Sequence, residues 1–180
     1  MSISKSIRES MEKGSWIRQM FEAGARLKAE YGAENVFDFS LGNPILEPPQ
    51  QVHEQLRLLL DNPEDGMHRY MPNAGFEETR EFIAGVMRDE TGHPFSSQDV
   101  VMCVGAGGGL NVVFKALLEA GDEVLALTPY FVEYGAYVQN HGGRLTLAQT
   151  TAEFQPDLNS IEVSLSDRIK IVIIHSPNNP

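Results

Sequence analysis

The sequence has little cysteine and no long apolar run. Its 180 residues include a single cysteine, Cys103. No disulfide can form within the chain, and we expect this residue, in the middle of an apolar strand, to belong to the core. The N-terminal segment lacks an apolar signal core, and no uninterrupted apolar stretch approaches the length of a membrane span. These absences predict a cytoplasmic protein without a membrane partner.

Positive charge is also scarce. The chain has 14 lysines and arginines against 25 acidic residues, a formal net charge of −11, and no basic run. A nucleic-acid backbone is therefore not an expected partner, and any anionic ligand must be held locally. The 5 histidines show no metal-ligand spacing among themselves or with Cys103, so we predict no metal site. Apolar residues make up 42% of the chain, enough for a sizeable core.

One stretch of the chain is rich in glycine. Asp99 to Val104 is typical of a short apolar strand, Gly105 to Gly109 of a turn, and Leu110 to Glu119 of a helix. The first turn of a helix carries backbone N–H groups without partners and a partial positive charge, and glycine lets an anion approach them closely. The stretch therefore predicts an anion-binding turn. Close packing of the strand against the helix explains the same glycines equally well.

The first half of the chain is predicted to be mostly helical. The apolar periodicity indicates helices over residues 10–31, 50–61 and 76–90, and a short strand over 36–41 that ends at the turn of residues 42–44. Four apolar residues of the second helix are expected on its buried side: Val52, Leu56, Leu59 and Leu60.

From Asp99 onward, strands and helices alternate. Strands are expected at residues 123–128, 144–148 and 170–175, with helices ending near residue 140 and running from an Asp157 cap to Leu165. This alternation predicts parallel strands joined by right-handed helical crossovers. Ligands of such sheets lie beyond the carboxyl ends of the strands. Residues 105–107, 128–131 and 176–179 follow these ends, so we expect them to converge on one edge.

Five motifs, taken in order, resemble the class I/II aminotransferases, which are pyridoxal-phosphate-dependent enzymes of fold type I. The motifs are Ser-Leu-Gly-Asn-Pro, Tyr-Met-Pro-Asn-Ala-Gly, Val-Gly-Ala-Gly-Gly-Gly-Leu, Ala-Gly-Asp-Glu-Val-Leu-Ala-Leu-Thr-Pro-Tyr-Phe and His-Ser-Pro-Asn-Asn-Pro. The resemblance implies an α/β fold, the three-layer α/β/α large domain with a mainly parallel sheet, incomplete here and preceded by an N-terminal helical segment. It implies that residues 1–45 form an arm contributing to the small domain and the active-site mouth, and that residues 46–180 begin the cofactor-binding large domain.

The resemblance also implies roles for single residues. Backbone groups of Gly105, Ala106 and Gly107 would hold the phosphate of pyridoxal 5'-phosphate, although many relatives have a side-chain donor in this turn. Phe131 matches the aromatic residue that stacks on the pyridine ring, and Asn179 matches the asparagine that hydrogen-bonds the phenolic oxygen. Without the family, ordinary core packing for Phe131 and a plain turn at Asn179 are the favoured interpretations.

Two further residues match positions at the mouth of the family's active site. Gly42 matches the glycine beside the substrate carboxylate, where a missing side chain leaves room, and a strand-ending turn explains it as well. Tyr70 matches the tyrosine that reaches the phosphate of a neighbouring subunit, which implies a homodimer with shared active sites. Taken alone, Tyr70 is more typical of a packed surface aromatic.

The chain departs from the family at its end. It stops at Pro180, inside a motif that usually continues Thr-Gly, and so lacks the family's downstream aspartate, Schiff-base lysine and substrate-binding arginine. None of its own lysines matches the required context: Lys5, Lys13, Lys28, Lys115 and Lys170. We therefore expect no catalytic residue in these 180 residues and no transamination by this polypeptide alone.

The resemblance implies transfer of an amino group between an amino acid and a 2-oxo acid in the complete enzyme. Alternatives are another pyridoxal-phosphate enzyme of the same fold, such as a lyase, decarboxylase or synthase, and a non-catalytic fragment. A nicotinamide-dependent oxidoreductase is disfavoured because its glycine fingerprint needs a small residue where Leu110 stands and an acidic residue near Thr128.

Overall fold

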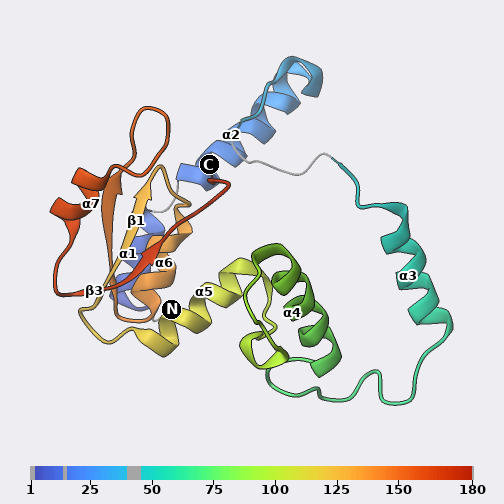
Figure 1. The fold of residues 1–180 in the computed structure, drawn as a ribbon. Coiled ribbons are helices and arrows are strands. Elements are labelled where there is room, and N and C mark those ends of the chain that lie inside the picture. Colours follow the sequence, from blue (N-terminus) through green and yellow to red (C-terminus); the bar gives the residue numbers. More distant parts are fainter. Residues whose placement is uncertain (1–2, 14–15, 40–45, 180) are drawn as a thin grey trace. The chain divides into compact units, whose positions relative to one another are not determined.

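The computed structural model describes residues 3–13, 16–39 and 46–179. The chain divides into two units, Met1–His68 and Arg69–Pro180. Figure 1 labels the helices and strands along the chain. The described part of the first unit is helical, with α1 (Lys5–Lys13), α2 (Trp16–Tyr31), a short 3-10 helix η1 (Ala33–Asn35) and α3 (Gln50–Asp61). The helix expected at residues 10–31 corresponds to the end of α1 and all of α2, with residues 14–15 outside the described part.

The strand expected at residues 36–41 is wrong over residues 36–39, which have no strand geometry. Residues 40–41 lie outside the described part of the chain. The segment instead contacts α2 through a side chain, because Lys28 Nζ donates to Asp38 Oδ2 at 2.6 Å. A strand needs a neighbouring strand to satisfy its backbone, and here the neighbour is a helix.

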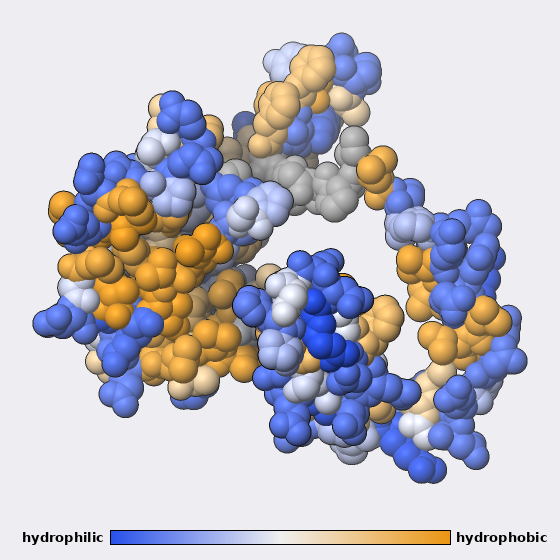
Figure 2. Space-filling model, in the orientation of Figure 1, coloured by the Kyte–Doolittle hydropathy of each residue, from blue (hydrophilic) through white to orange (hydrophobic). Residues whose placement is uncertain are grey.

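Helix α3 has the predicted bounds, but its predicted buried side is wrong. Val52 is 44% exposed, Leu56 55%, Leu59 50% and Leu60 79%. Figure 2 shows apolar side chains on this helix at the right of the view. An amphipathic pattern predicts which face of a helix can be buried, and burial itself requires a packing surface. The described part of this unit supplies none for α3.

The second unit contains a parallel sheet. Its elements in order are α4 (Glu77–Thr91), a 3-10 helix η2 (Ser97–Asp99), α5 (Gly105–Leu117), β1 (Glu123–Thr128), α6 (Glu133–Asn140), β2 (Arg144–Gln149), α7 (Leu158–Ser164) and β3 (Ile169–Ile173). The strand order is β2-β1-β3, and β1 pairs in parallel with both neighbours. The predicted alternation of strands and helices around a parallel sheet is confirmed.

The core of this unit lies between β1 and the two helices α5 and α6. Phe114 and Val138 are fully buried against Val124 of β1, and Leu118 completes the cluster. Each such side chain contributes about 1.5–3 kcal/mol when it leaves water. These contacts fix α5 and α6 on the sheet.

Helix α7 covers the outer edge of β2. Ser160 Oγ accepts the Gln149 N–H at 2.7 Å, and Ser164 Oγ donates to the Leu147 carbonyl at 3.3 Å. Two serines four residues apart on a helix lie on one face, so they satisfy backbone groups that β2 would leave unpaired. The predicted Asp157 cap of this helix is confirmed, because Asp157 Oδ1 accepts from the next turn.

Three predictions around the glycine stretch are wrong: the strand, the turn after it and the burial of the cysteine. Residues 99–104 form no strand, and α5 begins at Gly105, so the glycines form its first turns rather than a turn before it. Cys103, expected in the core, is exposed. The missing strand and the exposure of Cys103 have one physical reason: the segment has no strand beside it, and the Met102 N–H donates instead to the Ala74 carbonyl at 2.9 Å.

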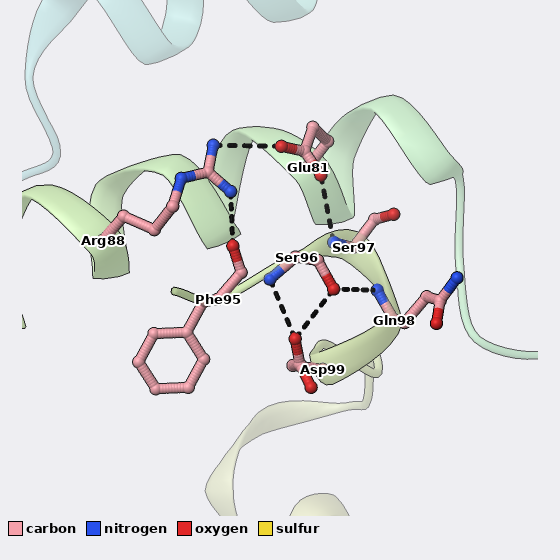
Figure 3. Close-up of polar contacts among 7 residues, drawn as sticks. All are labelled: Glu81, Arg88, Phe95, Ser96, Ser97, Gln98 and Asp99. Atoms are coloured by element: carbon pink, nitrogen blue, oxygen red, sulfur yellow. Dashed lines mark hydrogen bonds and ion pairs between the residues drawn. The ribbon is translucent and has the colours of Figure 1, made fainter. Parts of the chain in front are cut away.

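Polar contacts from α4 hold the segment that leads into α5 (Figure 3). Arg88 donates to Glu81 Oε1 at 3.0 Å and to the Phe95 carbonyl, and Glu81 Oε2 accepts the Ser97 N–H at 3.0 Å. The hydrogen bond from Arg88, helped by the Ser97 N–H, lowers the pKa of Glu81. The carboxylate therefore remains charged and keeps both contacts at neutral pH.

A capping box closes the same loop. Asp99 Oδ2 accepts the N–H and the hydroxyl of Ser96, both at 2.8 Å, and these bonds lower the pKa of Asp99 (Figure 3). Gly75 has φ of +96°, and a Cβ there would stand 2.4 Å from Met102 Cγ. Only glycine fits this position, which brings the start of α4 beside the segment before α5.

Candidate functional site

The ends of β1 and β3 meet at the carboxyl edge of the sheet. Because the two strands are parallel neighbours, the residues after each strand leave the sheet side by side. Asn178 Nδ2 donates to the Pro129 carbonyl at 3.2 Å, which ties the two segments together. A cavity of about 390 Å³ opens there, with Tyr130, Tyr134 and His175 in its wall. This is the edge where sequence reasoning expects a ligand.

Three aromatic rings run along this edge. Phe131 and Tyr134 pack edge to face with centroids 5.7 Å apart, and the Tyr134 hydroxyl lies 2.9 Å from His175 Nδ1. Burial raises the pKa of Tyr134, and the nearby Tyr137 adds to the shift. Tyr134 therefore stays neutral over the physiological range, and its ring packs against that of Phe131. The half-buried ring of Phe131 is positioned by this contact.

The glycine stretch forms the first turn of α5. Gly105 has φ of +65°, a conformation that favours glycine, and nothing lies within 4 Å of where its Cβ would stand. The Gly108 N–H donates to the Val104 carbonyl at 3.2 Å and closes the turn. The N–H groups of the residues before it have no partner within the helix. The turn therefore presents backbone donors, at the positive end of a helix of 13 residues.

Helix α6 contacts this turn at Gly107. A Cβ on Gly107 would stand 3.0 Å from the Tyr137 hydroxyl, a tight contact that would require Tyr137 to shift. Asn111 Nδ2 donates to the Gly107 carbonyl at 2.8 Å, and Asn111 Oδ1 lies 3.0 Å from His141 Nε2. The helix that begins just after Phe131 therefore also touches the glycine turn.

The predicted site residues differ in their surroundings. Gly105 and Ala106 are exposed, Gly107 and Phe131 are half-buried, and Asn179 and Tyr70 are exposed. Gly42 lies outside the described residues. The structure brings together the segments after β1 and β3, and the contact between them is made by Asn178, the neighbour of the predicted Asn179.

Sequence reasoning missed five residues around this site: Asn111, Tyr134, Tyr137, His141 and His175. A signal existed for the two tyrosines, because they follow Phe131 at intervals of three residues and so lie along one side of α6. The histidines were considered only as metal ligands. The pairing of His141 with Asn111 spans 30 residues of sequence and has no local signal.

A metal-binding cluster and a membrane-spanning helix are both absent from the described ranges. Among residues 3–13, 16–39 and 46–179, no cluster of three or more histidine, cysteine or acidic residues is arranged to hold a metal ion. In the same ranges, no helix is long and apolar enough to cross a membrane.

Comparison with known proteins gives one consistent result. The family model for aminotransferase class I and II matches residues 34–180. The chain is 35% identical over 141 residues to the aspartate/prephenate aminotransferase of Thermus thermophilus, covering 77% of this chain and 36% of the relative. It is 30% identical over 171 residues to the aspartate aminotransferase of Pyrococcus horikoshii, covering 93% of this chain and 41% of the relative.

Solved structures agree. An aminotransferase from Eubacterium rectale superposes with a TM-score of 0.91 at 35% identity, over 100% of this chain and 46% of that one. The aspartate aminotransferase of Thermus thermophilus with maleate gives a TM-score of 0.82 at 29% identity, again over 46% of its length. The chain thus spans less than half the length of the relatives it matches. On its sequence and its fold, the chain belongs to the aminotransferase class I and II family of pyridoxal-phosphate-dependent enzymes.

Proposed function

We propose that the protein to which this chain belongs transfers an amino group between an amino acid and a 2-oxo acid, with pyridoxal 5'-phosphate as cofactor. The observation that carries the proposal is the double contact of α6, which flanks the glycine turn at Gly107 and positions Phe131 through Tyr134. A single helix thereby contacts both the proposed anion-binding turn and a flat apolar ring. A planar aromatic phosphate ester needs both.

The glycine turn fits a phosphate group. The backbone N–H groups of Ala106 and Gly107 would donate to its oxygens, and Gly105 leaves the approach open because nothing lies within 4 Å of its Cβ position. No side-chain donor occurs between Gly105 and Gly109. The backbone and the helix dipole therefore carry phosphate recognition within this turn.

The segments after β1 and β3 fit the ring. Phe131 would stack on the pyridine face, and its contact with Tyr134, with ring centroids 5.7 Å apart, holds its ring in place. Asn179 would donate to the phenolic oxygen from a backbone segment that Asn178 ties to β1. The two residues approach the ring from neighbouring strands, which fixes its orientation in the site.

Two further residues, Tyr70 and Gly42, have proposed roles away from the carboxyl edge of the sheet. Tyr70 is fully exposed, which supports a role in which its hydroxyl reaches the phosphate held by a second subunit of a homodimer. Gly42 would leave room for the substrate carboxylate.

The bound cofactor supplies a carbonyl carbon that exchanges the amino group and a ring that withdraws electrons, and the residues named above would bind and orient it. We propose a cytoplasmic location for the protein.

Binding of the cofactor is tested on the full natural polypeptide that contains this chain. Titration with pyridoxal 5'-phosphate, followed by absorbance, gives a dissociation constant for the parent protein and for Phe131→Ala. We expect the substitution to weaken binding about tenfold, because it removes an aromatic stacking contact. Phe82→Ala is the matched control, since Phe82 is 73% exposed on α4. Unchanged affinity in Phe131→Ala contradicts the assigned role.

The reaction type needs its own experiment. Aspartate is the first amino donor to test, because the relatives named above are aspartate aminotransferases. Product analysis should show one 2-oxo acid formed from the donor for each amino group gained by the acceptor. Release of carbon dioxide or of free ammonia in place of this exchange would identify another reaction on the same fold and would contradict the proposal.

A further inference from the structure

A chain of two hydrogen bonds runs from the end of α6 to the first turn of α5. His141 Nε2 lies 3.0 Å from Asn111 Oδ1, and Asn111 Nδ2 donates to the Gly107 carbonyl at 2.8 Å. His141 is the residue that follows α6, and both it and Asn111 are half-buried. Two elements that are 30 residues apart in sequence are thereby joined at the glycine turn.

The direction of these hydrogen bonds is determined. A backbone carbonyl only accepts, so the Asn111 amide nitrogen must face Gly107 and its oxygen must face His141. An amide oxygen also only accepts, so His141 Nε2 must carry a hydrogen. His141 is therefore the donor to Asn111, and this hydrogen bond fixes the orientation of the Asn111 side chain.

The turn that receives these bonds is intrinsically weak. Four of the five residues from Gly105 to Gly109 are glycine. Each glycine within a helix costs about 1 kcal/mol relative to alanine, because its backbone loses more freedom on folding. Glycines that admit an anion therefore also loosen the donors that must hold it. A fixed side chain on the Gly107 carbonyl offsets this loss.

These hydrogen bonds hold the peptide group between Gly107 and Gly108, which directly follows the proposed donors. The Gly107 carbonyl shares its peptide plane with the Gly108 N–H, which donates to the Val104 carbonyl at 3.2 Å. With Asn111 holding one side of this plane and Val104 the other, the plane cannot rotate. The Gly107 N–H lies in the preceding peptide plane, which joins this one at the Gly107 Cα, so the held plane is the anchor from which that donor extends.

We propose that Asn111 and His141 are positioning residues that hold the first turn of α5 in the geometry that binds phosphate. The proposal rests on the proposed function, in which this turn holds the cofactor phosphate. Neither side chain needs to touch the ligand. Their effect is expected on the phosphate part of the cofactor and not on its ring, which the segments after β1 and β3 contact.

The test compares two ligands, pyridoxal 5'-phosphate and pyridoxal, which lacks the phosphate. Dissociation constants are measured with the full natural polypeptide for the parent, His141→Leu and Asn111→Asp. Leucine removes the donor, and aspartate keeps an acceptor for His141 while losing the donor to Gly107. His141→Gln restores a donor at nearly the position of Nε2. Gln139→Leu, at an exposed position near the end of the same helix, is the control.

We expect His141→Leu and Asn111→Asp to weaken binding of pyridoxal 5'-phosphate about tenfold, the effect of one lost hydrogen bond, and to leave pyridoxal unchanged. His141→Gln should regain most of the affinity. Equal weakening for both ligands, or no recovery in His141→Gln, would overturn the inference. If the parent itself binds both ligands equally, the proposed phosphate site is wrong, which is a separate result.

Discussion

The Tyr134 hydroxyl lies 2.9 Å from Nδ1 of His175, so α6 and the segment after β3 are joined at the carboxyl edge of the sheet. Tyr134 is only 5% exposed, and its ring packs against Phe131. This pair links the ring proposed to stack on the cofactor to the strand whose continuation carries Asn179. Its consequences for stability and for the neighbouring glycine turn can be measured.

The pH dependence of stability should report Tyr134. Burial raises its pKa above the ordinary value of 10.0, so the folded state keeps a proton that the unfolded chain has lost. Stability should therefore fall as the pH rises through about 10. Urea unfolding between neutral pH and pH about 11 should show a smaller decline in Tyr134→Phe than in the parent.

Tyr70→Phe is the matched control for this prediction, because Tyr70 is fully exposed. Loss of the Tyr70 hydroxyl should leave the decrease in unfolding free energy at alkaline pH the same as in the parent. At neutral pH, Tyr134→Phe should cost about 1 kcal/mol of unfolding free energy for the lost hydrogen bond to His175. A Tyr134→Phe protein with the parent's full alkaline decline would contradict the role of burial.

Acid should weaken the loop before α5 through Glu81. Its pKa is lowered by the hydrogen bond from Arg88, so its contribution is present above the unfolded pKa near 4.5 and is lost as pH falls through the folded value. Glu81→Gln should therefore show a flatter loss of stability below this pH. Glu78→Gln, on the same helix and exposed, should follow the parent curve. Identical curves for all three proteins would contradict this prediction.

Gly107 should tolerate no side chain while Tyr137 keeps its hydroxyl. A Cβ at Gly107 would stand 3.0 Å from the Tyr137 hydroxyl, whereas at Gly108 the nearest atom is Val104 Cβ at 3.6 Å, an ordinary contact. Gly107→Ala should therefore weaken binding of pyridoxal 5'-phosphate about tenfold, and Gly108→Ala should not. A larger β-branched residue, Gly107→Val, should abolish phosphate binding.

A double variant identifies the cause. Gly107→Ala combined with Tyr137→Phe removes the hydroxyl, and the next atom of the ring, Cζ, lies at 3.5 Å, an ordinary contact distance. Affinity should then return toward that of Tyr137→Phe alone, measured by the same titration. If the double variant stays as weak as Gly107→Ala, steric contact with Tyr137 is not the reason.

The core between α5, α6 and β1 should depend on Phe114. The side chain is fully buried against Val124 and Val138, so Phe114→Ala should cost about 3–5 kcal/mol of unfolding free energy. Val113→Ala, at the adjacent position and 43% exposed, should cost far less. Thermal or urea unfolding of both variants checks this. Similar losses in both would mean that the core is not centred on Phe114.

Much of the second unit was predictable from local sequence signals. The strands expected at residues 123–128, 144–148 and 170–175, with helices between them, correspond to β1, β2 and β3, which are parallel as expected. Asp157 specifies the start of α7, because its side chain satisfies N–H groups only two and three residues away. Such signals involve residues close together in the chain and can therefore be recognised in the sequence.

The remaining features depended on distant contacts. Cys103 lies in an apolar run yet is exposed, because a strand requires a neighbour that the run itself does not encode. The Gly107 carbonyl is held through Asn111 by His141, and Tyr134 reaches His175 across 41 residues. The family, the parallel sheet and the presence of a glycine-rich segment follow from the sequence alone, whereas the place of that segment within α5 does not. The side chains that hold this segment and the sheet edge are known only from the fold, because their contacts join elements that are brought together by packing.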